Sequence, residues 1–578
     1  MKKILSMLLS IAMLVSLSVT AFAADDTSVG VIGGADGPTS LLISPNPGAV
    51  LETPDLENMT EAELDAYFAQ LEAQYEAEMA AMAAEQKAQM IAAAKSLMPY
   101  KTGVNVWLNG AYMTFTDAVP VVKEGRTQVP FRAILEGLGA TVSYDAGKID
   151  AVFADGSVMK LAIGSKVMTY AYGENNAELT TVNMDVAPFI DKATGRTYVP
   201  ARFIGETLGL TVTWDPELWV AYIVDWDALE AEIDGQFTKI NEMLALSVSA
   251  QLDETKTYKS TDSITLSGVL DGQSKDPFEI SLKGTGLTQG QNMSGSYEIG
   301  IDMGGYKSLI EAEGAEMEAA LDVIDGQTVD MIIHAENGVF LRSDLINLLT
   351  GGMVAENGWL EVVGMEDMKA LYTEAGINMD NLVTQATAPG FTMGKLVRVM
   401  CEDGELGRAM GYMAPDSTGR MFTAIYAAML GDEQIKVTGS SSKTYKCTFD
   451  ETDLLDAMVN AGFFAAEDAD AAKDMFKEMG MNVDFAMTMT ARNGKITKST
   501  ADMTMAMTGV KMTMDVEGTT TSSKGSMVLD IDEVGKFELE FTSRISTSKD
   551  APLSGPTAGE QVVTLQELIN AFAGTLVE

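Results

Sequence analysis

Histidine and cysteine are almost absent from this sequence. Its 578 residues include one histidine, His334, and two cysteines, Cys401 and Cys447. Imidazole is the usual ligand of protein-bound copper, and the serine-histidine-aspartate triad needs a histidine base, so the composition argues against both kinds of catalytic centre. The two cysteines could pair in an oxidising compartment, but we expect two separate buried thiols.

Sequence motifs for catalysis and metal binding are missing too. There is no G-x-S-x-G, G-x-x-x-x-G-K-[ST], H-E-x-x-H or C-x-x-C motif, and no D-x-D-x-D-G run for calcium. We therefore predict a protein that is not an enzyme, with no catalytic residues, no cofactor and no metal. Acidic residues are abundant, so a hydrolase that uses only Asp and Glu stays open as a minor alternative.

Basic residues are scarce relative to acidic ones. There are 39 Lys and Arg against 83 Asp and Glu, which gives a net charge of −44 and a pI near 4.2. Such a chain repels phosphates, so we predict no nucleic-acid partner. We interpret the charge as a solvated surface, with a specific cation role as the alternative.

Long apolar runs are missing after the first segment, so we predict no membrane span. Residues 1–23 have a basic start, an apolar stretch and the small-residue site Ala21-Phe22-Ala23, which predicts a signal peptide. No cysteine follows that would anchor a lipoprotein. We expect a secreted, extracellular protein associated with the cell envelope.

Residues 24–54 are rich in Gly, Pro and Ser and are expected to form a linker. The segment Gly33–Thr39 reads GGADGPT and resembles a segment of sodium-pumping decarboxylase β subunits. That resemblance implies a sodium site at Asp36, but we favour an exposed, turn-rich tail.

Residues 55–98 are predicted to form a helix, which begins with a capping box at Thr60 and Glu63. A heptad-like stripe follows, comprising Leu64, Phe68, Leu71, Tyr75 and Met82. We expect the helix to pack on a neighbouring module; a short coiled coil is the alternative.

An internal repeat organises the next part of the chain. Gly125–Arg132 reads GRTQVPFR, and Gly195–Arg202 reads GRTYVPAR 70 positions later. The same register is kept by the motif residues Arg126, Pro130, Arg132, Glu136, Gly139 and Asp145 in the first copy and Arg196, Pro200, Arg202, Glu206, Gly209, Trp214 and Asp215 in the second.

Each copy predicts a short strand, a proline, a helix and a second strand. Pro130 and Pro200 are expected at the first helical position, and Gly139 and Gly209 at the left-handed C-cap. Each helix should carry an Arg–Glu pair four residues apart. We interpret the four motif arginines as structural, paired with Glu136 and Glu206 or with backbone carbonyls; contact with an anion or a glycan is the alternative.

These residues resemble the copper amine oxidase N-terminal-like domain of secreted bacterial proteins, over about 103–226. The resemblance implies a small α+β module that serves as a stalk or envelope unit. We call residues 101–226 the repeat module. Within it, Ile149–Tyr172 is expected to form a β-meander. After Asp225 a linker helix is predicted from Trp226 to Leu246, and we assign residues 227–247 as the linker segment.

Residues 249–548 alternate apolar and polar side chains, which predicts a large antiparallel sheet with one wet face. Helices are expected near 366–375, 394–409, 416–430, 452–460 and 466–479, and a final linker and helix over 549–578. The fold class is therefore α+β: a duplicated small module, an antiparallel-sheet domain with covering helices, and an N-terminal helix.

This arrangement resembles in topology the LolA/LppX-like carriers of envelope lipids, in which a curved sheet surrounds an apolar cavity. The candidate cavity residues are Met503, Met505, Met507, Met512 and Met514, since Met is over-used at adaptable apolar surfaces. Ordinary core packing is the alternative interpretation, and we favour it.

Together these features predict a stalk or wall-association module joined to a domain that binds an apolar or wall-derived ligand. The partners expected are a cell-wall or envelope component and a lipid or other apolar molecule. The alternative is a purely structural or adhesive surface protein. The sequence does not specify an oligomeric state.

Overall fold

The computed structural model describes residues 61–172, 179–249, 253, 255–272, 274–290, 292–307, 321–334, 338–363, 390–460, 469–553, 555–557, 559–565 and 567–568. The chain divides into two compact units, Met1–Leu97 and Met98–Glu578. The predicted signal peptide, linker and Gly33–Thr39 segment lie outside the described residues, as do the predicted helix near 366–375 and most of the final helix.

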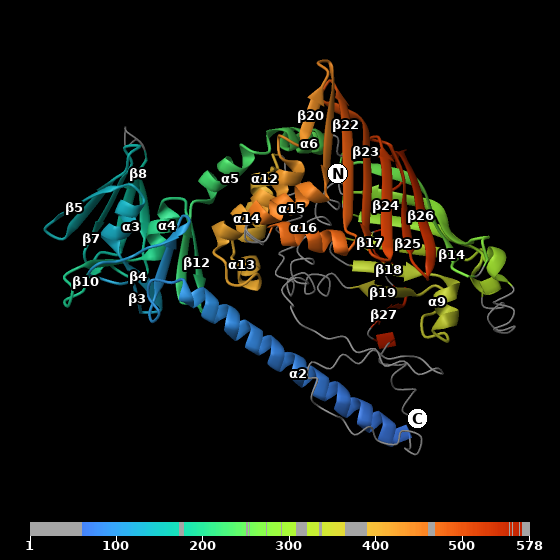
Figure 1. The fold of residues 1–578 in the computed structure, drawn as a ribbon, viewed down its shortest axis with the longest axis horizontal. Coiled ribbons are helices and arrows are strands. Elements are labelled where there is room, and N and C mark those ends of the chain that lie inside the picture. The colour runs from blue at the N-terminus through green and yellow to red at the C-terminus, as the bar shows by residue number, and fades with distance from the viewer. Residues whose placement is uncertain are drawn as a thin grey trace. The chain divides into compact units, whose positions relative to one another are not determined.

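The first unit contains helix α2, Glu61–Ser96 (Figure 1). Its bounds agree with the helix predicted at 55–98 over the residues described. Met82, the last residue of the predicted stripe, is exposed. Packing of this helix on a partner stays a prediction.

In the second unit, the repeat module consists of short strands and two short helices. The strands are β1 Asn105–Leu108, β2 Ala111–Tyr112, β3 Val121–Lys123, β4 Arg126–Pro130, β5 Thr141–Asp145, β6 Lys148–Val152, β7 Val158–Ala162, β8 Val167–Ala171, β9 Leu179–Asn183, β10 Phe189–Ile190, β11 Thr197–Pro200, β12 Thr211–Asp215 and β13 Val220–Val224. They form three sheets, ordered β12-β13-β1-β2, β10-β11-β4-β3 and β5-β6-β7-β8-β9.

The equivalent strands of the two copies meet at the centre of this module. β4 and β11 pair antiparallel, with Val129 opposite Val199. Helices α3 (Phe131–Gly137) and α4 (Ala201–Thr207) follow these strands, and Ile134 and Ile204 on them are fully buried. Each copy therefore has the predicted strand, helix and strand, and both contribute to one hydrophobic core.

The helix ends of the module differ slightly from the prediction. Pro130 and Pro200 are the N-cap residues, with extended backbone, and each helix begins one residue later than expected. Both prolines still close the strand pair between β4 and β11, which holds their backbone extended. Gly139 and Gly209 have φ of 83° and 76°, which confirms the left-handed position just after each helix.

The predicted single helix at 226–246 is wrong. Two helices, α5 (Trp226–Asp234) and α6 (Thr238–Ser249), replace it. The break falls at Gly235, a poor helix former, and at Phe237, which is fully buried. Asp432, far along the chain, then accepts a hydrogen bond from the backbone N–H of Lys239 at 2.8 Å and caps the second helix.

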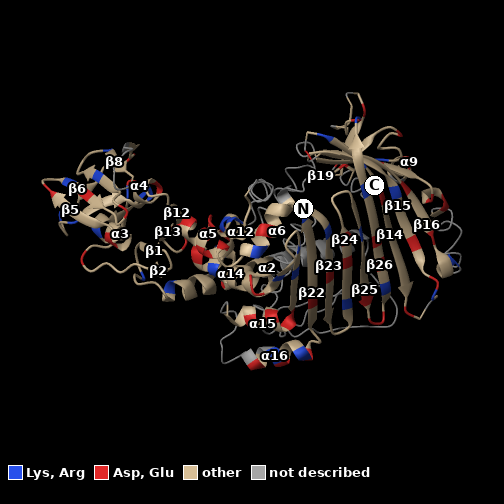
Figure 2. Ribbon diagram, turned by 90° about the horizontal axis from the view of Figure 1, so that it is seen from above, with Lys and Arg blue, Asp and Glu red and all other residues tan. Residues whose placement is uncertain are grey.

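The rest of the unit contains a sheet of fourteen strands. These are β14 Thr257–Leu270, β15 Phe278–Gln289, β16 Asn292–Asp302, β17 Thr328–His334, β18 Gly338–Arg342, β19 Trp359–Val363, β20 Ile435–Thr438, β21 Ser442–Asp450, β22 Asn482–Arg492, β23 Lys495–Met507, β24 Val510–Gly518, β25 Ser522–Ile531, β26 Gly535–Ser548 and β27 Val562–Thr564. Their order is β20 to β26, then β14 to β19, then β27, and they lie side by side in one broad sheet (Figures 1 and 2).

The two halves of the sheet join through its longest pairing. β26 pairs antiparallel with β14 from Thr257 opposite Ser548 to Leu270 opposite Gly535. The antiparallel prediction is thus confirmed, except at one edge, where β27 runs parallel to β19. The predicted limit at residue 548 is therefore too early, because a strand beyond it completes the sheet.

Helices lie between β19 and β20 and between β21 and β22 in sequence. They are α12 Met393–Cys401, α13 Glu405–Ala409, α14 Pro415–Leu430, α15 Glu451–Asn460 and α16 Ala469–Glu478, with α9 Asp344–Leu349 and the 3-10 turn η2 Gly304–Tyr306 elsewhere. We call α12 to α16 the helical layer. α14 and α15 contact β21, and α15 also contacts β22, so the layer covers one end of the sheet.

Candidate functional site

The methionines singled out in the sequence lie together on two neighbouring strands. Met503 on β23 is directly opposite Met514 on β24, and Met505 is opposite Met512. Met507, on the same face, ends β23 and is 48% exposed. The pairing therefore brings all five candidate residues to one face of the sheet.

The same face continues as an apolar surface across seven strands. Because opposite residues in a sheet share a face, the register places Met527 beside Met514, Leu539 beside Met527, Leu266 beside Leu539 and Ile280 beside Leu266. We define the apolar face by Met503, Met505, Met512, Met514, Met527, Leu529, Phe537, Leu539, Phe541, Ile264, Leu266, Ile280, Leu282, Ile299 and Ile301.

Exposure of this surface rises away from the helical layer. On β22, Phe485 and Met489 are each 1% exposed. On the apolar face itself every residue is half-buried or exposed, and Met527, Ile280 and Ile264 reach 36%, 40% and 43%. The helices thus bury only the first strands of an apolar surface that extends well beyond them.

The opposite face of these strands is polar. It carries Asp502, Thr504, Lys511, Thr513, Asp515, Ser526, Asp530, Lys536, Glu538 and Glu540. Figure 2 shows Lys, Arg, Asp and Glu along the same strands. An antiparallel sheet with one wet face normally packs its other face on a core, so a half-exposed apolar face of this extent is a candidate site.

Two hollows lie in the repeat module, away from this face. One measures about 210 Å³ and includes Arg126, Arg202 and Trp214; the other measures about 640 Å³ and includes Phe115, Phe189 and Tyr198. None of the candidate methionines lines either hollow. Enclosure of the methionines in a cavity therefore stays a prediction; among the described residues they lie on a half-exposed face of the sheet.

All four motif arginines form ion pairs. Two of them pair with the predicted glutamates, and two pair with aspartates that were not predicted. Arg132 and Glu136 are 4.0 Å apart, and Arg202 and Glu206 are 3.7 Å apart, as predicted. Arg126 instead pairs with Asp185 at 2.6 Å, and Arg196 pairs with Asp117. These two arginines thus connect to loops outside the motif, which the repeat pattern does not reveal.

Asp145 and Asp215 occupy equivalent positions in the repeat but have different surroundings. Asp145 is exposed, whereas the side chain of Asp215 is 5% exposed. Asp215 accepts hydrogen bonds from the backbone N–H groups of Glu217 and Leu218, and Arg408 of α13 lies 3.3 Å from it. Of these two equivalent aspartates, Asp215 is the one that contacts the helical layer.

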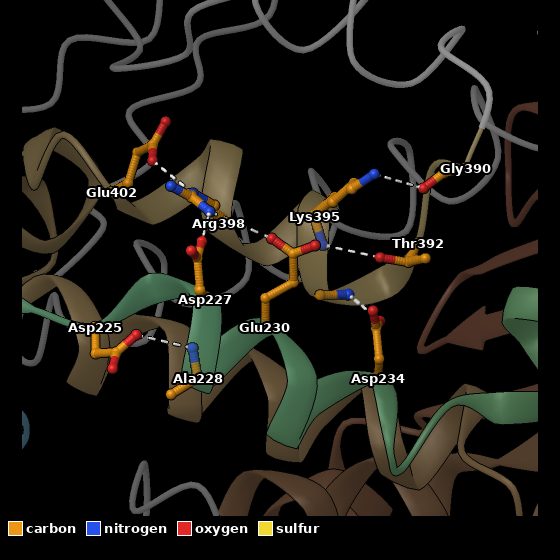
Figure 3. Close-up of polar contacts among 11 residues, drawn as sticks. Asp225, Asp227, Ala228, Glu230, Asp234, Gly390, Thr392, Lys395, Arg398 and Glu402 are labelled. Atoms are coloured by element: carbon orange, nitrogen blue, oxygen red, sulfur yellow. Dashed lines mark hydrogen bonds and ion pairs between the residues drawn. The ribbon is translucent and has the colours of Figure 1, made fainter. Parts of the chain in front are cut away.

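The acidic helix α5 fixes the same junction (Figure 3). Arg398 of α12 contacts Asp227 at 2.7 Å and Glu230 at 3.5 Å, and Glu402 of its own helix at 2.9 Å. Asp234 accepts a hydrogen bond from the backbone N–H of Gly394 at 2.8 Å. The segment after the repeat module is thus held by the helical layer. Sequence reasoning missed Arg398 and Arg408, because no local pattern marks their partners.

Both cysteines are free and buried, which confirms the expected separate thiols. Burial raises the pKa of both, to about 12 for Cys447, so neither is a reactive thiolate near neutral pH. In the described part of the chain, no three His, Cys, Asp or Glu side chains are grouped to hold a metal ion. No described helix is both long and apolar enough to cross a bilayer.

One pair of facing carboxylates in the described part of the chain bears on the alternative of a hydrolase that uses Asp and Glu. Asp502 and Asp515 are directly opposite each other on the polar face of β23 and β24. Burial and the neighbouring carboxyl raise the pKa of Asp502. Both residues are exposed, and neither lines the two hollows of the repeat module.

Comparison with known families supports one part of the sequence interpretation. Residues 107–223 match the family model of the copper amine oxidase N-terminal domain. The match runs from β1 to β13 and contains both motif copies, within the predicted range 103–226. This match supports the interpretation of these residues as a non-catalytic, stalk-like module. No curated protein matches the chain.

Proposed function

We propose that this chain is a secreted, non-catalytic protein of the cell envelope that binds an apolar ligand, such as the acyl chains of a lipid, on the apolar face. The repeat module serves as a stalk or wall-association unit. The single observation that carries the proposal is the half-exposed apolar face on β23–β26 and β14–β16. The resemblance to LolA/LppX-like carriers agrees with this proposal in topology.

Covering this face with an apolar ligand is favourable because it buries apolar side chains. Fully burying an aliphatic or Met side chain is worth about 1.5–3 kcal/mol relative to leaving it exposed. A half-exposed side chain has gained only part of this burial free energy. A ligand that covers several such residues would supply the remainder for each of them, in total on the order of a few kcal/mol. Flexible methionines such as Met514 and Met527 adapt to acyl chains of different shape.

The test is titration of the delipidated chain with a fluorescent fatty acid. We expect saturable binding that is weakened by the double substitution Met527→Glu with Ile280→Glu, which places two charges on the apolar face. The matched control is Val528→Glu with Ser281→Glu, whose residues lie next in sequence on the opposite face. Equal binding by both double variants, or no binding by the native chain, would contradict the proposal.

An adhesive or structural role is the second candidate, because an apolar sheet face can also pack against a protein surface. In that case the fatty acid does not bind, and the native chain associates in sedimentation while the Met527→Glu/Ile280→Glu variant does not. The envelope assignment is tested separately, by fractionation of cells that express the whole chain and by retention of residues 101–226 on isolated cell walls.

A further inference from the structure

The repeat module has a hollow between its two copies. Its lining is basic, although the chain as a whole is acidic. β4 of the first copy supplies Arg126 and Thr127, and α4 and β12 of the second supply Arg202 and Trp214. The full lining is Val122, Gly125, Arg126, Thr127, Pro200, Ala201, Arg202, Val212, Thr213, Trp214 and Ala221. It contains two arginines and no acidic residue, in a protein with 83 acidic and 39 basic residues.

The hollow exists because two lining positions hold small residues. Ala201 begins α4, and its equivalent in the first copy is Phe131, which begins α3. Ala221 is opposite Trp214 across the β12–β13 pair, and its equivalent, opposite Tyr144 in the β5–β6 pair, is Ile149. Phe131 and Ile149 are both buried, so large side chains fill the first copy where alanines leave room in the second.

Both arginines line this hollow, but their guanidinium groups are held differently. Arg126 is held by Asp185, which lies 2.8 Å from its Nε and 2.6 Å from its Nη2, and its Nη1 donates to the backbone oxygen of Gly125. Arg202 lies 3.7 Å from Glu206, which is longer than a hydrogen bond, so this contact leaves the guanidinium donors available. Arginine is suited to carboxylates because its planar fork donates two parallel hydrogen bonds. The volume of about 210 Å³ is below the roughly 300–1,000 Å³ usual for drug-sized ligands.

We propose that this hollow binds a single acidic sugar unit of a glycan, with Arg202 on its carboxylate and Trp214 against its ring. An aromatic side chain supplies a rigid, apolar surface for a sugar face, and Trp219, 50% exposed, lies near with its ring centroid 6.5 Å from that of Trp214. The binding requires only the repeat module and does not depend on the function proposed for the large sheet.

The experiment uses the full chain and a trisaccharide of galacturonate, with the neutral galactose trisaccharide and sodium sulfate as comparison probes. Calorimetry should show binding of the acidic trisaccharide that weakens as salt rises, because the contact is electrostatic and partly exposed. Arg202→Gln should weaken it roughly tenfold, the usual scale for one charge-assisted hydrogen bond. Arg132→Gln, the equivalent change in the first copy, should leave it unchanged.

The double substitution Ala201→Phe with Ala221→Ile gives the second copy the side chains of the first. It should abolish binding, and retention of the native circular dichroism and thermal midpoint shows that the variant is folded. Equal affinity for the acidic and neutral trisaccharides, binding of sulfate without preference for the acidic sugar, or an equal loss in Arg132→Gln would each overturn the proposal.

Discussion

Trp107 donates its indole N–H to Oδ1 of Asp416 at 2.8 Å, which joins β1 of the repeat module to the start of α14, 309 positions later in the chain. Asp416 is 2% exposed. Burial raises the pKa of this carboxyl, and the hydrogen bond from Trp107 opposes that rise. The buried carboxylate of Asp416 is stabilised by the indole N–H of Trp107, because a buried polar group without a hydrogen-bond partner is costly.

Replacing Trp107 with Phe should therefore lower the stability of the second unit by about 1–3 kcal/mol at neutral pH, the cost of leaving one buried polar group unsatisfied. The raised folded-state pKa means that protonation of Asp416 favours the folded state. The penalty should thus shrink as the pH falls through that pKa, because a neutral carboxyl costs less to bury. Denaturant unfolding of the variant at neutral and acid pH measures both effects.

The control for this substitution is Trp219→Phe in the same module, since Trp219 is 50% exposed. It should change the unfolding midpoint little at either pH. A loss in Trp107→Phe no larger than that of the control would show that the hydrogen bond to Asp416 does not stabilise the junction.

Gly394 permits the close approach of α12 to α5. A Cβ on this residue would lie 2.6 Å from the backbone oxygen of Glu230 and 2.9 Å from Oδ1 of Asp234. Gly394→Ala should push the helices apart, weaken the contacts of Arg398 and lower stability by about 1–3 kcal/mol, as overpacking does. The measurement is the thermal unfolding midpoint.

Gly235 offers a matched comparison at the end of α5. Its backbone is right-handed, with φ of −62°, and the nearest atom to an added Cβ is 3.4 Å away. Gly235→Ala should be neutral or stabilising by up to about 1 kcal/mol, because it restricts the unfolded chain. A similar loss in both variants would rule out the close approach as the cause.

Asp502 and Asp515 are like charges directly opposite each other in β23 and β24. Asp502→Asn should raise stability at pH 7 by about 0.2–1 kcal/mol, the usual scale for a cross-strand pair. Since the folded-state pKa of Asp502 is raised, its repulsion is present above that pKa and is lost as the pH falls through it. The advantage of the variant should therefore disappear in acid.

Asp530 is a control on the same face of the sheet, because its cross-strand neighbours carry the opposite charge. It lies between Lys511 and Lys536 on the neighbouring strands. Asp530→Asn removes favourable pairs and should lower stability slightly at pH 7. If Asp502→Asn also lowers stability, cross-strand repulsion is not the dominant effect at that site.

Local features of the sequence were enough for much of the fold. The 70-residue register predicted two similar strand–helix–strand copies, because a helix face and a glycine cap are set by residues a few positions apart. Alternation in segments such as Val483–Met489 and Met503–Met507 predicted long antiparallel strands, because the side-chain period of a strand is two. The same alternation predicted that one face of the sheet is exposed to solvent.

The tertiary structure decided what those elements do together. The pairing of β14 with β26 joins segments nearly three hundred residues apart, and the apolar face exists only because that register aligns Leu266 with Leu539. The equivalent aspartates Asp145 and Asp215 have the same local sequence role, yet only Asp215 meets Arg408. Likewise, the repeat register makes Phe131 and Ala201 equivalent positions with side chains of different size. The tertiary packing shows that the smaller side chain lines a hollow. Local sequence sets the conformation of each segment, whereas exposure, ion pairing and empty space depend on which distant segments fold against it.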